Sequence, residues 1–243
     1  MTEAVPSNDA LKFGWGAMKK HVSFFIIVLI LGFLVYLVPD YYIQKVKKEA
    51  PLMAGLVGLA AWVLQTIVSL GYARISLRIC DEEKPEVGDL LAAYPLFFKF
   101  LIASLLYSGL CFLAFIPMMI SSLMGYYLKD AVNPLVAVFA VAGLGLTLFL
   151  FAYIGATFWF YIFIIVDKQA GPLDALKQSA AMTQGKRRKI FLFLLALLGV
   201  NILGCLAFIA GLFASIPTTM IASAYLYKKM ALPVGPQALP SGS

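Results

Sequence analysis

The sequence predicts an all-α fold: a polytopic membrane helical bundle with six transmembrane helices arranged as three hairpins. Of the 243 residues, 62% are hydrophobic and 13% are charged, whereas soluble domains carry about 25% charged residues. The mean hydropathy of +0.92 leaves too few polar side chains to cover a globule in water. The apolar residues are also gathered in long runs without ionisable side chains. Soluble enzyme folds and nucleic-acid-binding domains are therefore excluded.

The predicted spans come from five runs that lack Asp, Glu, Lys, Arg and His. A bilayer core about 30 Å thick needs about 20 apolar residues in a helix. The first four runs predict one helix each, with residues 131–138 as a loop or interfacial turn because Asn133 and Pro134 favour a turn. The fifth run is long enough for two short crossings with a turn within residues 211–217. The five runs are residues 22–39, 50–73, 100–128, 131–166 and 190–227.

The first run, residues 22–39, lacks a small-residue cleavage site, so we expect it to stay as the first span. Basic residues in short loops remain on the cytoplasmic side of a membrane. With six spans and the N-terminus inside, the outer side receives few of the 19 basic residues, and both termini are cytoplasmic. The net charge of +7 then reflects an anionic inner leaflet and requires no nucleic acid. The outer basic residues are Lys45, Lys47, Lys48 and Lys129.

A similar sequence motif precedes the first, third and fifth predicted spans and indicates an internal repeat. Each copy of the motif combines a proline with an aspartate and continues with apolar and then basic residues. The aspartates are Asp9, Asp89 and Asp174. Asp is a good N-cap, and Pro suits a helix start. The three copies of the motif predict three short amphipathic interfacial helices on the cytoplasmic side, each capped by its aspartate. The alternative is that three capped loop helices resemble one another by chance.

The repeat predicts a single membrane domain over residues 1–243. Its three hairpin units cover about residues 1–80, 81–167 and 168–230, and residues 231–243 form a flexible tail.

Residues 163–227 carry a resemblance to a known group of proteins. The quoted stretch is Ile165-Val-Asp167-Lys-Gln-Ala-Gly171-Pro-Leu-Asp-Ala-Leu-Lys-Gln-Ser179, followed by Thr183 and Gly185. It resembles the YciC-like uncharacterised bacterial inner-membrane proteins with six helices. It is also similar to the membrane domain found beside some glycerophosphoryl diester phosphodiesterases. The resemblance implies a bacterial inner-membrane location and a compact bundle, and it brings no catalytic residues.

Two amides in the predicted spans, Gln65 and Asn201, are candidates for a hydrophilic path. Amides more often bond across packed helices, and we favour packing over transport. Basic residues beside the spans are candidates for contact with anionic lipids, although a topology signal needs no specific lipid. These are Lys19, Lys20, Lys99, Lys186, Arg187, Arg188 and Lys189.

Other residues of types that often bind metals or catalyse reactions lack the neighbouring residues that such sites require. The acidic run of residues 81–83 has no histidines at ligand spacing, so we expect a solvated loop rather than a metal site. His21 follows two lysines at the lipid boundary, which favours an interfacial residue over a catalytic base. The 3 cysteines predict neither a disulfide framework nor a CxxC metal site. We expect no cofactor and no enzymatic activity.

Small residues four apart predict close contacts between helices, either within the bundle or between two copies of the chain. They are Ala54 with Gly58, Ala152 with Ala156, and Ala207 with Gly211 and Ser215. Together, these observations favour a non-enzymatic integral membrane protein that acts by lipid contact or as a scaffold that docks a partner. Membrane lipids, a second copy and another membrane protein are the partners left open. The second hypothesis is a small transporter or channel with a path near Gln65 and Asn201.

Overall fold

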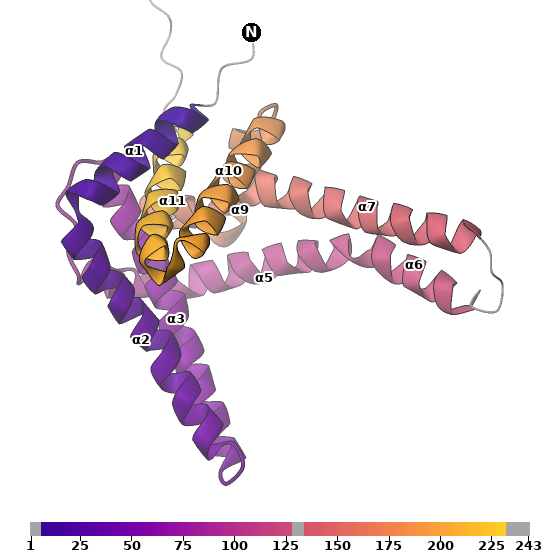
Figure 1. Ribbon diagram of the computed structural model, residues 1–243, viewed down its shortest axis with the longest axis horizontal. Coiled ribbons are helices and arrows are strands. Elements are labelled where there is room, and N and C mark those ends of the chain that lie inside the picture. Colours follow the sequence, from indigo (N-terminus) through magenta and orange to yellow (C-terminus); the bar gives the residue numbers. More distant parts are fainter. Residues whose placement is uncertain (1–5, 128–133, 232–243) are drawn as a thin grey trace, which may run out of the picture. The chain divides into compact units, whose positions relative to one another are not determined.

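The computed structural model describes residues 6–127 and 134–231, without the side chains of residues 134, 135 and 208–210, and every regular element in these ranges is a helix (Figure 1). The all-α prediction is therefore confirmed. Within these ranges, five helical stretches are long and apolar enough to cross a membrane. They are Val22–Val46, Pro51–Cys80, Asp89–Tyr127, Val136–Lys168 and Arg187–Leu206.

The chain divides into two compact units. The first comprises Met1–Tyr94 and Gly199–Ser243, and the second comprises Pro95–Leu198. Helix α10, Arg187–Leu206, contributes residues to both. The three predicted hairpin units stay a prediction, because this division groups residues by contact rather than by repeat.

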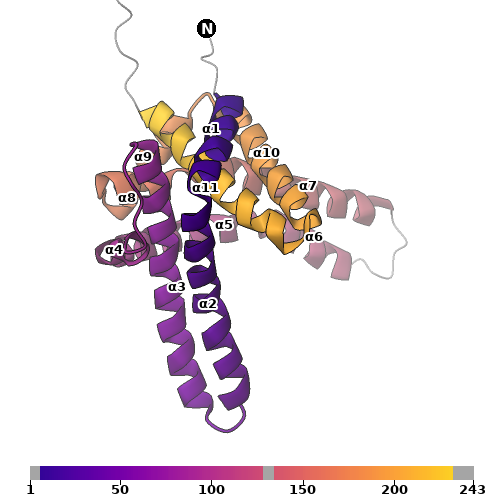
Figure 2. The ribbon, with the colours of Figure 1, turned by 60° about the vertical axis from the view of Figure 1, so that its left-hand side comes forward.

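The first unit is built on a long helical hairpin. Helices α2 (Val22–Val46) and α3 (Pro51–Cys80) lie side by side, as Figures 1 and 2 show. Helix α1 (Ser7–Lys20) precedes α2 and packs on α11 (Phe208–Ala231), which also contacts α3. The core between them contains Met18, Phe25, Val28, Val68, Ile75, Ile79, Leu90 and Ile221.

Two glycines of this unit lie where the backbone of another helix comes very close. A Cβ atom at Gly71 of α3 would overlap the backbone of Leu90, which belongs to the short helix α4 (Asp89–Ala92). A Cβ atom at Gly14 of α1 would overlap the carbonyl oxygen of Thr218 in α11. The chain therefore folds α4 against α3, and α1 against α11, at positions where a side chain has no room.

The turn between α10 and α11 lies at Ala207, so the prediction of a turn within residues 211–217 is wrong. Pro217 lies inside α11 instead. A Cβ atom on Gly211 would overlap the backbone of Gly204, and a Cβ atom on Gly204 would overlap the side chain of Ser215. Glycine here serves helix packing, and proline is tolerated within membrane helices, so neither residue marks the turn.

The second unit consists of broken helices. Helix α5 (Phe97–Ala114) follows the 3₁₀ turn Tyr94–Leu96 and is separated from α6 (Ile116–Tyr127) at Phe115. Pro117 lies at the start of α6, and its ring is incompatible with continuation of the preceding helix. Helix α7 (Pro134–Phe158) packs along α6 and is followed by α8 (Tyr161–Lys168) and α9 (Pro172–Thr183).

The predicted loop over residues 131–138 is wrong for its second part, because α7 begins at Pro134. Proline is favoured at the first position of a helix, so this residue starts α7 rather than extending a turn. Residues 131–133 lie outside the described residues, and so do residues 232–243 of the predicted tail.

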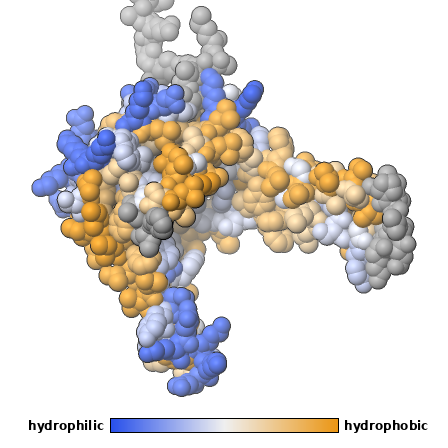
Figure 3. All heavy atoms as spheres, viewed as in Figure 1, coloured by the Kyte–Doolittle hydropathy of each residue, from blue (hydrophilic) through white to orange (hydrophobic). Residues whose placement is uncertain are grey.

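Large apolar side chains are exposed along the candidate spans. Figure 3 shows apolar surface along the α2–α3 hairpin, between its hydrophilic tip and the hydrophilic region at its other end. Phe33 of α2 is 62% exposed and Leu52 of α3 is 79% exposed. Soluble monomers rarely expose contiguous apolar surface of this extent, whereas lipid requires it.

Candidate functional site

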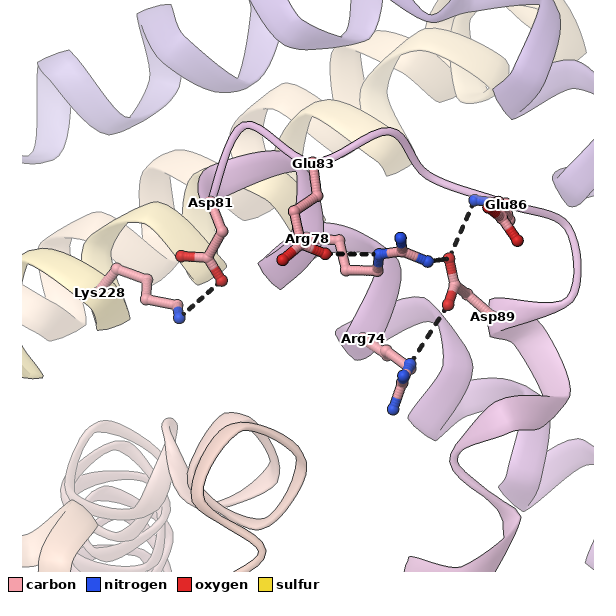
Figure 4. Close-up of polar contacts among 7 residues, drawn as sticks. All are labelled: Arg74, Arg78, Asp81, Glu83, Glu86, Asp89 and Lys228. Carbon is pink, nitrogen blue, oxygen red and sulfur yellow. Dashed lines mark hydrogen bonds and ion pairs between the residues drawn. The ribbon is translucent and has the colours of Figure 1, made fainter.

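A buried carboxylate lies where α3 meets α4. Asp89 is 4% exposed and accepts hydrogen bonds from two arginines of α3, as Figure 4 shows. Arg78 Nη1 lies 2.6 Å from Asp89 Oδ2, and Arg74 Nε lies 3.3 Å from Asp89 Oδ1. The backbone N–H of Glu86 donates to Oδ2 at 2.9 Å. Charge-assisted bonds from three donors compensate the cost of burying this charge.

The local sequence explains how these groups meet. Arg74 and Arg78 are four residues apart and therefore lie on one face of α3. The chain leaves α3 at Cys80 and turns back through Glu82, which has a positive φ of 61°. Because Gly71 has no side chain, the returning chain can pack α4 on α3. This packing brings Asp89 next to the two arginines.

The acidic run at residues 81–83 takes part in ion pairs. Asp81 Oδ2 lies 2.9 Å from Lys228 Nζ of α11, and Glu83 Oε2 lies 2.9 Å from Arg78 Nε. Among the described residues, no group of three or more His, Cys, Asp or Glu has an arrangement that holds a metal ion. The Asp81–Lys228 pair joins the ends of α3 and α11. The Glu83–Arg78 pair adds a second carboxylate to the arginine that binds Asp89.

The three aspartates of the repeat lie in the first turns of α1, α4 and α9. The prediction that Asp9, Asp89 and Asp174 are N-caps is wrong. The N-cap positions are occupied by Pro6, Gly88 and Gly171. Each helix begins at or before its aspartate, so the aspartate belongs to the first turn and does not precede the helix as a cap does.

Helix α1 presents two different faces. Ala10, Gly14 and Met18 are buried, in line with the packing of α1 on α11. Trp15 is 47% exposed on another side, and Lys19 Nζ lies 5.0 Å from the centre of its ring. The small and apolar stripe of α1 is therefore covered by protein, while an aromatic and basic face stays exposed.

The seven basic candidates belong to two units. Lys19 and Lys20 are exposed in the first unit, and the other five lie in the second. Lys99 Nζ donates to the carbonyl of Gln169 at 2.6 Å. Arg187 donates to the hydroxyl of Tyr153 and lies 4.6 Å from the centre of that ring. Lys186 and Lys189 also have interaction partners, and Arg188 is exposed.

The two amides bond within separate pairs of helices. Gln65 Nε2 donates to the carbonyl of Val35 at 3.5 Å, which joins α3 to α2. Asn201 Nδ2 donates to Thr219 Oγ1 at 3.3 Å, which joins α10 to α11. Each bond is of the kind that holds packed membrane helices together.

The motif around Ser179 supports the break between α7 and α8. Ser179 and Thr183 of α9 both donate to the carbonyl of Thr157, at 3.0 and 3.1 Å. The backbone N–H of Phe160 donates to Ser179 Oγ at 3.3 Å. The two hydroxyls thus bond to backbone groups at the break between α7 and α8. Gly185 follows α9 with a positive φ of 74°, a conformation that glycine adopts without strain.

Sequence reasoning found Asp89 but missed Arg74 and Arg78 as its partners. The i, i+4 spacing of these arginines at the end of a span is the signal that was available. It does not by itself reveal that the chain turns back along α3, because that turn depends on Gly71 and on the returning loop.

Because the described part of the chain is built of helices and includes five apolar stretches of this length, the protein is a multi-pass membrane-embedded protein. Residues 6–232 match the family described as Protein of unknown function (DUF975), and the chain belongs to this family. No curated protein and no solved structure matches the chain. The predicted resemblance to an uncharacterised family is confirmed at this level.

Proposed function

We propose that this protein is a non-enzymatic integral membrane protein that contacts anionic lipids through the exposed face of α1. The observation that carries the proposal is the pair of Trp15 and Lys19. Both lie in the last turns of α1, directly before the first candidate span begins at Val22. Indole rings favour the headgroup region, and lysine is attracted to anionic headgroups there.

The topology of this proposal has six spans, with both termini in the cytoplasm of a bacterium. Helix α11 supplies the sixth crossing: it is continuous over 24 residues and carries Lys228 and Lys229 in its last turn. The order of elements supports an internal repeat, because α1, α4 and α9 each precede a pair of long helical segments. The inner-membrane location and the relation to YciC-like proteins and phosphodiesterase membrane domains belong to the same proposal.

Lipid retention tests the proposed function. Full-length protein purified in mild detergent is offered phosphatidylglycerol and phosphatidylcholine with the same acyl chains, and the bound lipids are counted by native mass spectrometry. We expect more phosphatidylglycerol than phosphatidylcholine, and less of it in Trp15→Ala and Lys19→Gln. Lys48→Gln, which removes the same charge at the tip of the α2–α3 hairpin, is the control. Equal retention in all variants contradicts the proposal.

The alternative function is a small transporter or channel near Gln65 and Asn201. The direct bonds of both amides to neighbouring helices favour packing. Solute or ion flux in proteoliposomes that disappears in Gln65→Leu or Asn201→Leu contradicts the lipid-contact proposal and favours transport.

A further inference from the structure

A cavity of about 620 Å³ lies between the end of α1 and the loop that follows α3. Its volume is within the range of about 300–1,000 Å³ that is common for small-molecule sites. Phe13, Ala17 and Ile79 give it an apolar part. The remaining lining residues are Gly16, Lys20, His21, Glu82, Glu83 and Lys84.

The charged lining has both signs. Glu83 is paired with Arg78 at 2.9 Å and is therefore neutralised. The side chains of Lys20, Glu82 and Lys84 have no hydrogen-bond or salt-bridge partner within residues 6–127 and 134–231. Two ammonium groups and one carboxylate are thus left to bind a ligand. A ligand with one anionic and one cationic group fits this set better than a purely anionic ligand, which Glu82 would repel.

The cavity lies at a defined position along the first unit. His21 lines it and directly precedes Val22, where the first candidate span begins. Burial lowers the pKa of His21 below its usual value of 6.5, and neighbouring Lys20 lowers it further. Lys20, His21 and Lys84 thus line a polar cavity beside the start of the first candidate span, and such a boundary is where lipid headgroups lie rather than acyl chains.

We propose that this cavity binds a phosphoethanolamine group, supplied by the headgroup of a phospholipid. The phosphate lies against Lys20 and Lys84, and the primary ammonium donates hydrogen bonds to Glu82. The apolar part of the cavity accommodates the ethylene carbons. The positive φ of Glu82 holds this residue in the turn that lines the cavity. This inference rests on the proposed function of lipid contact and names a lipid class and a site separate from Trp15 and Lys19.

The test compares three lipids with identical acyl chains on the full-length protein by native mass spectrometry: phosphatidylethanolamine, phosphatidylcholine and phosphatidylglycerol. A quaternary ammonium cannot donate a hydrogen bond, so the unsubstituted protein should retain phosphatidylethanolamine about tenfold more than phosphatidylcholine. Glu82→Gln should remove this preference. Lys84→Gln should reduce retention of both zwitterionic lipids. Glu49→Gln and Lys48→Gln, at the tip of the α2–α3 hairpin, are the matched controls.

An unchanged preference for phosphatidylethanolamine in Glu82→Gln overturns the inference, provided that the variant melts like the unsubstituted protein. Glu82→Lys is the second variant and should exclude the lipid more strongly. If an equal concentration of soluble O-phosphoethanolamine displaces the lipid, the cavity does not require a phospholipid, and the proposal that a lipid supplies the phosphoethanolamine group is overturned. If phosphatidylglycerol retention still depends on Lys19 while no phosphatidylethanolamine preference is found, this inference fails and the proposed function stands. If neither lipid is retained, both fail.

Discussion

Arg78 and Asp89 form the shortest ion pair described in the first unit, with 2.6 Å between Nη1 and Oδ2. The pair joins the end of a candidate membrane span to a helix of four residues that packs beside it. Arg78 also holds Glu83, so a single side chain connects both ends of the returning loop. This loop also lines the cavity at the end of α1, and its position therefore determines where Glu82 and Lys84 lie.

Removing Arg78 should destabilise the protein more than removing Arg74. Arg78 makes the shorter contact and its side chain is 26% exposed, whereas that of Arg74 is 40% exposed. We expect Arg78→Gln to lower the free energy of unfolding more than Arg74→Gln, because Asp89 then stays buried without its shortest charged contact. Arg74→Gln should cost about 1 kcal/mol. Thermal unfolding in detergent measures both, with exposed Arg188→Gln as the control. Equal destabilisation by Arg78→Gln and Arg74→Gln would contradict the conclusion that the shorter contact to Asp89 is the more important one.

Gly71→Ala should move α4 away from α3. The new methyl group would overlap the backbone of Leu90, which cannot rotate away as a side chain can. We expect a loss of about 1–3 kcal/mol in unfolding free energy. Gly55→Ala is the matched control in the same helix, because a Cβ atom there meets nothing within 4 Å and should be neutral or stabilising. A Gly71→Ala variant as stable as Gly55→Ala would contradict this packing.

The apolar runs were predictable because hydropathy is a local property of the chain. The runs at residues 22–39 and 50–73 became α2 and α3. The contacts of Asp89 were not predictable in the same way, because they join residues through a chain reversal that hydropathy does not record. Gly211 and Pro217 led to the wrong prediction of a turn within residues 211–217, because in soluble proteins both residue types commonly end helices. In this chain both residues lie inside α11.

Ser179→Ala should weaken the junction between α7 and α8. Without the hydroxyl, the backbone N–H of Phe160 loses this hydrogen bond in a buried position. The net loss of a buried hydrogen bond costs about 1 kcal/mol. Hydrogen exchange should show faster exchange at Phe160 and its neighbours. Lys177→Ala, on the exposed side of the same helix, should leave this exchange unchanged, and protection retained in Ser179→Ala would refute the proposed role of the hydroxyl.

Gly185→Ala should destabilise the turn between α9 and α10. The φ of 74° at this residue is strained for any side chain with a Cβ atom, at a cost of about 1–2 kcal/mol. Gly185→Asn should cost less, because asparagine tolerates this conformation better. Gly199→Ala, which meets nothing within 4 Å, is the control for loss of glycine alone. Equal melting temperatures for Gly185→Ala and Gly185→Asn would contradict this reasoning.

Cysteine labelling should separate six spans from five. In a background with Cys80, Cys111 and Cys205 replaced by alanine, a membrane-impermeant maleimide is added to intact spheroplasts. With six spans and a cytoplasmic N-terminus, Lys48→Cys is labelled from outside, whereas Lys229→Cys is labelled only after the membrane is opened. With five spans, α11 does not cross, so Lys229→Cys is labelled from outside as well. The position of Lys229 is decisive because it lies in the last turn of α11, which is the only helix on which the two topologies disagree.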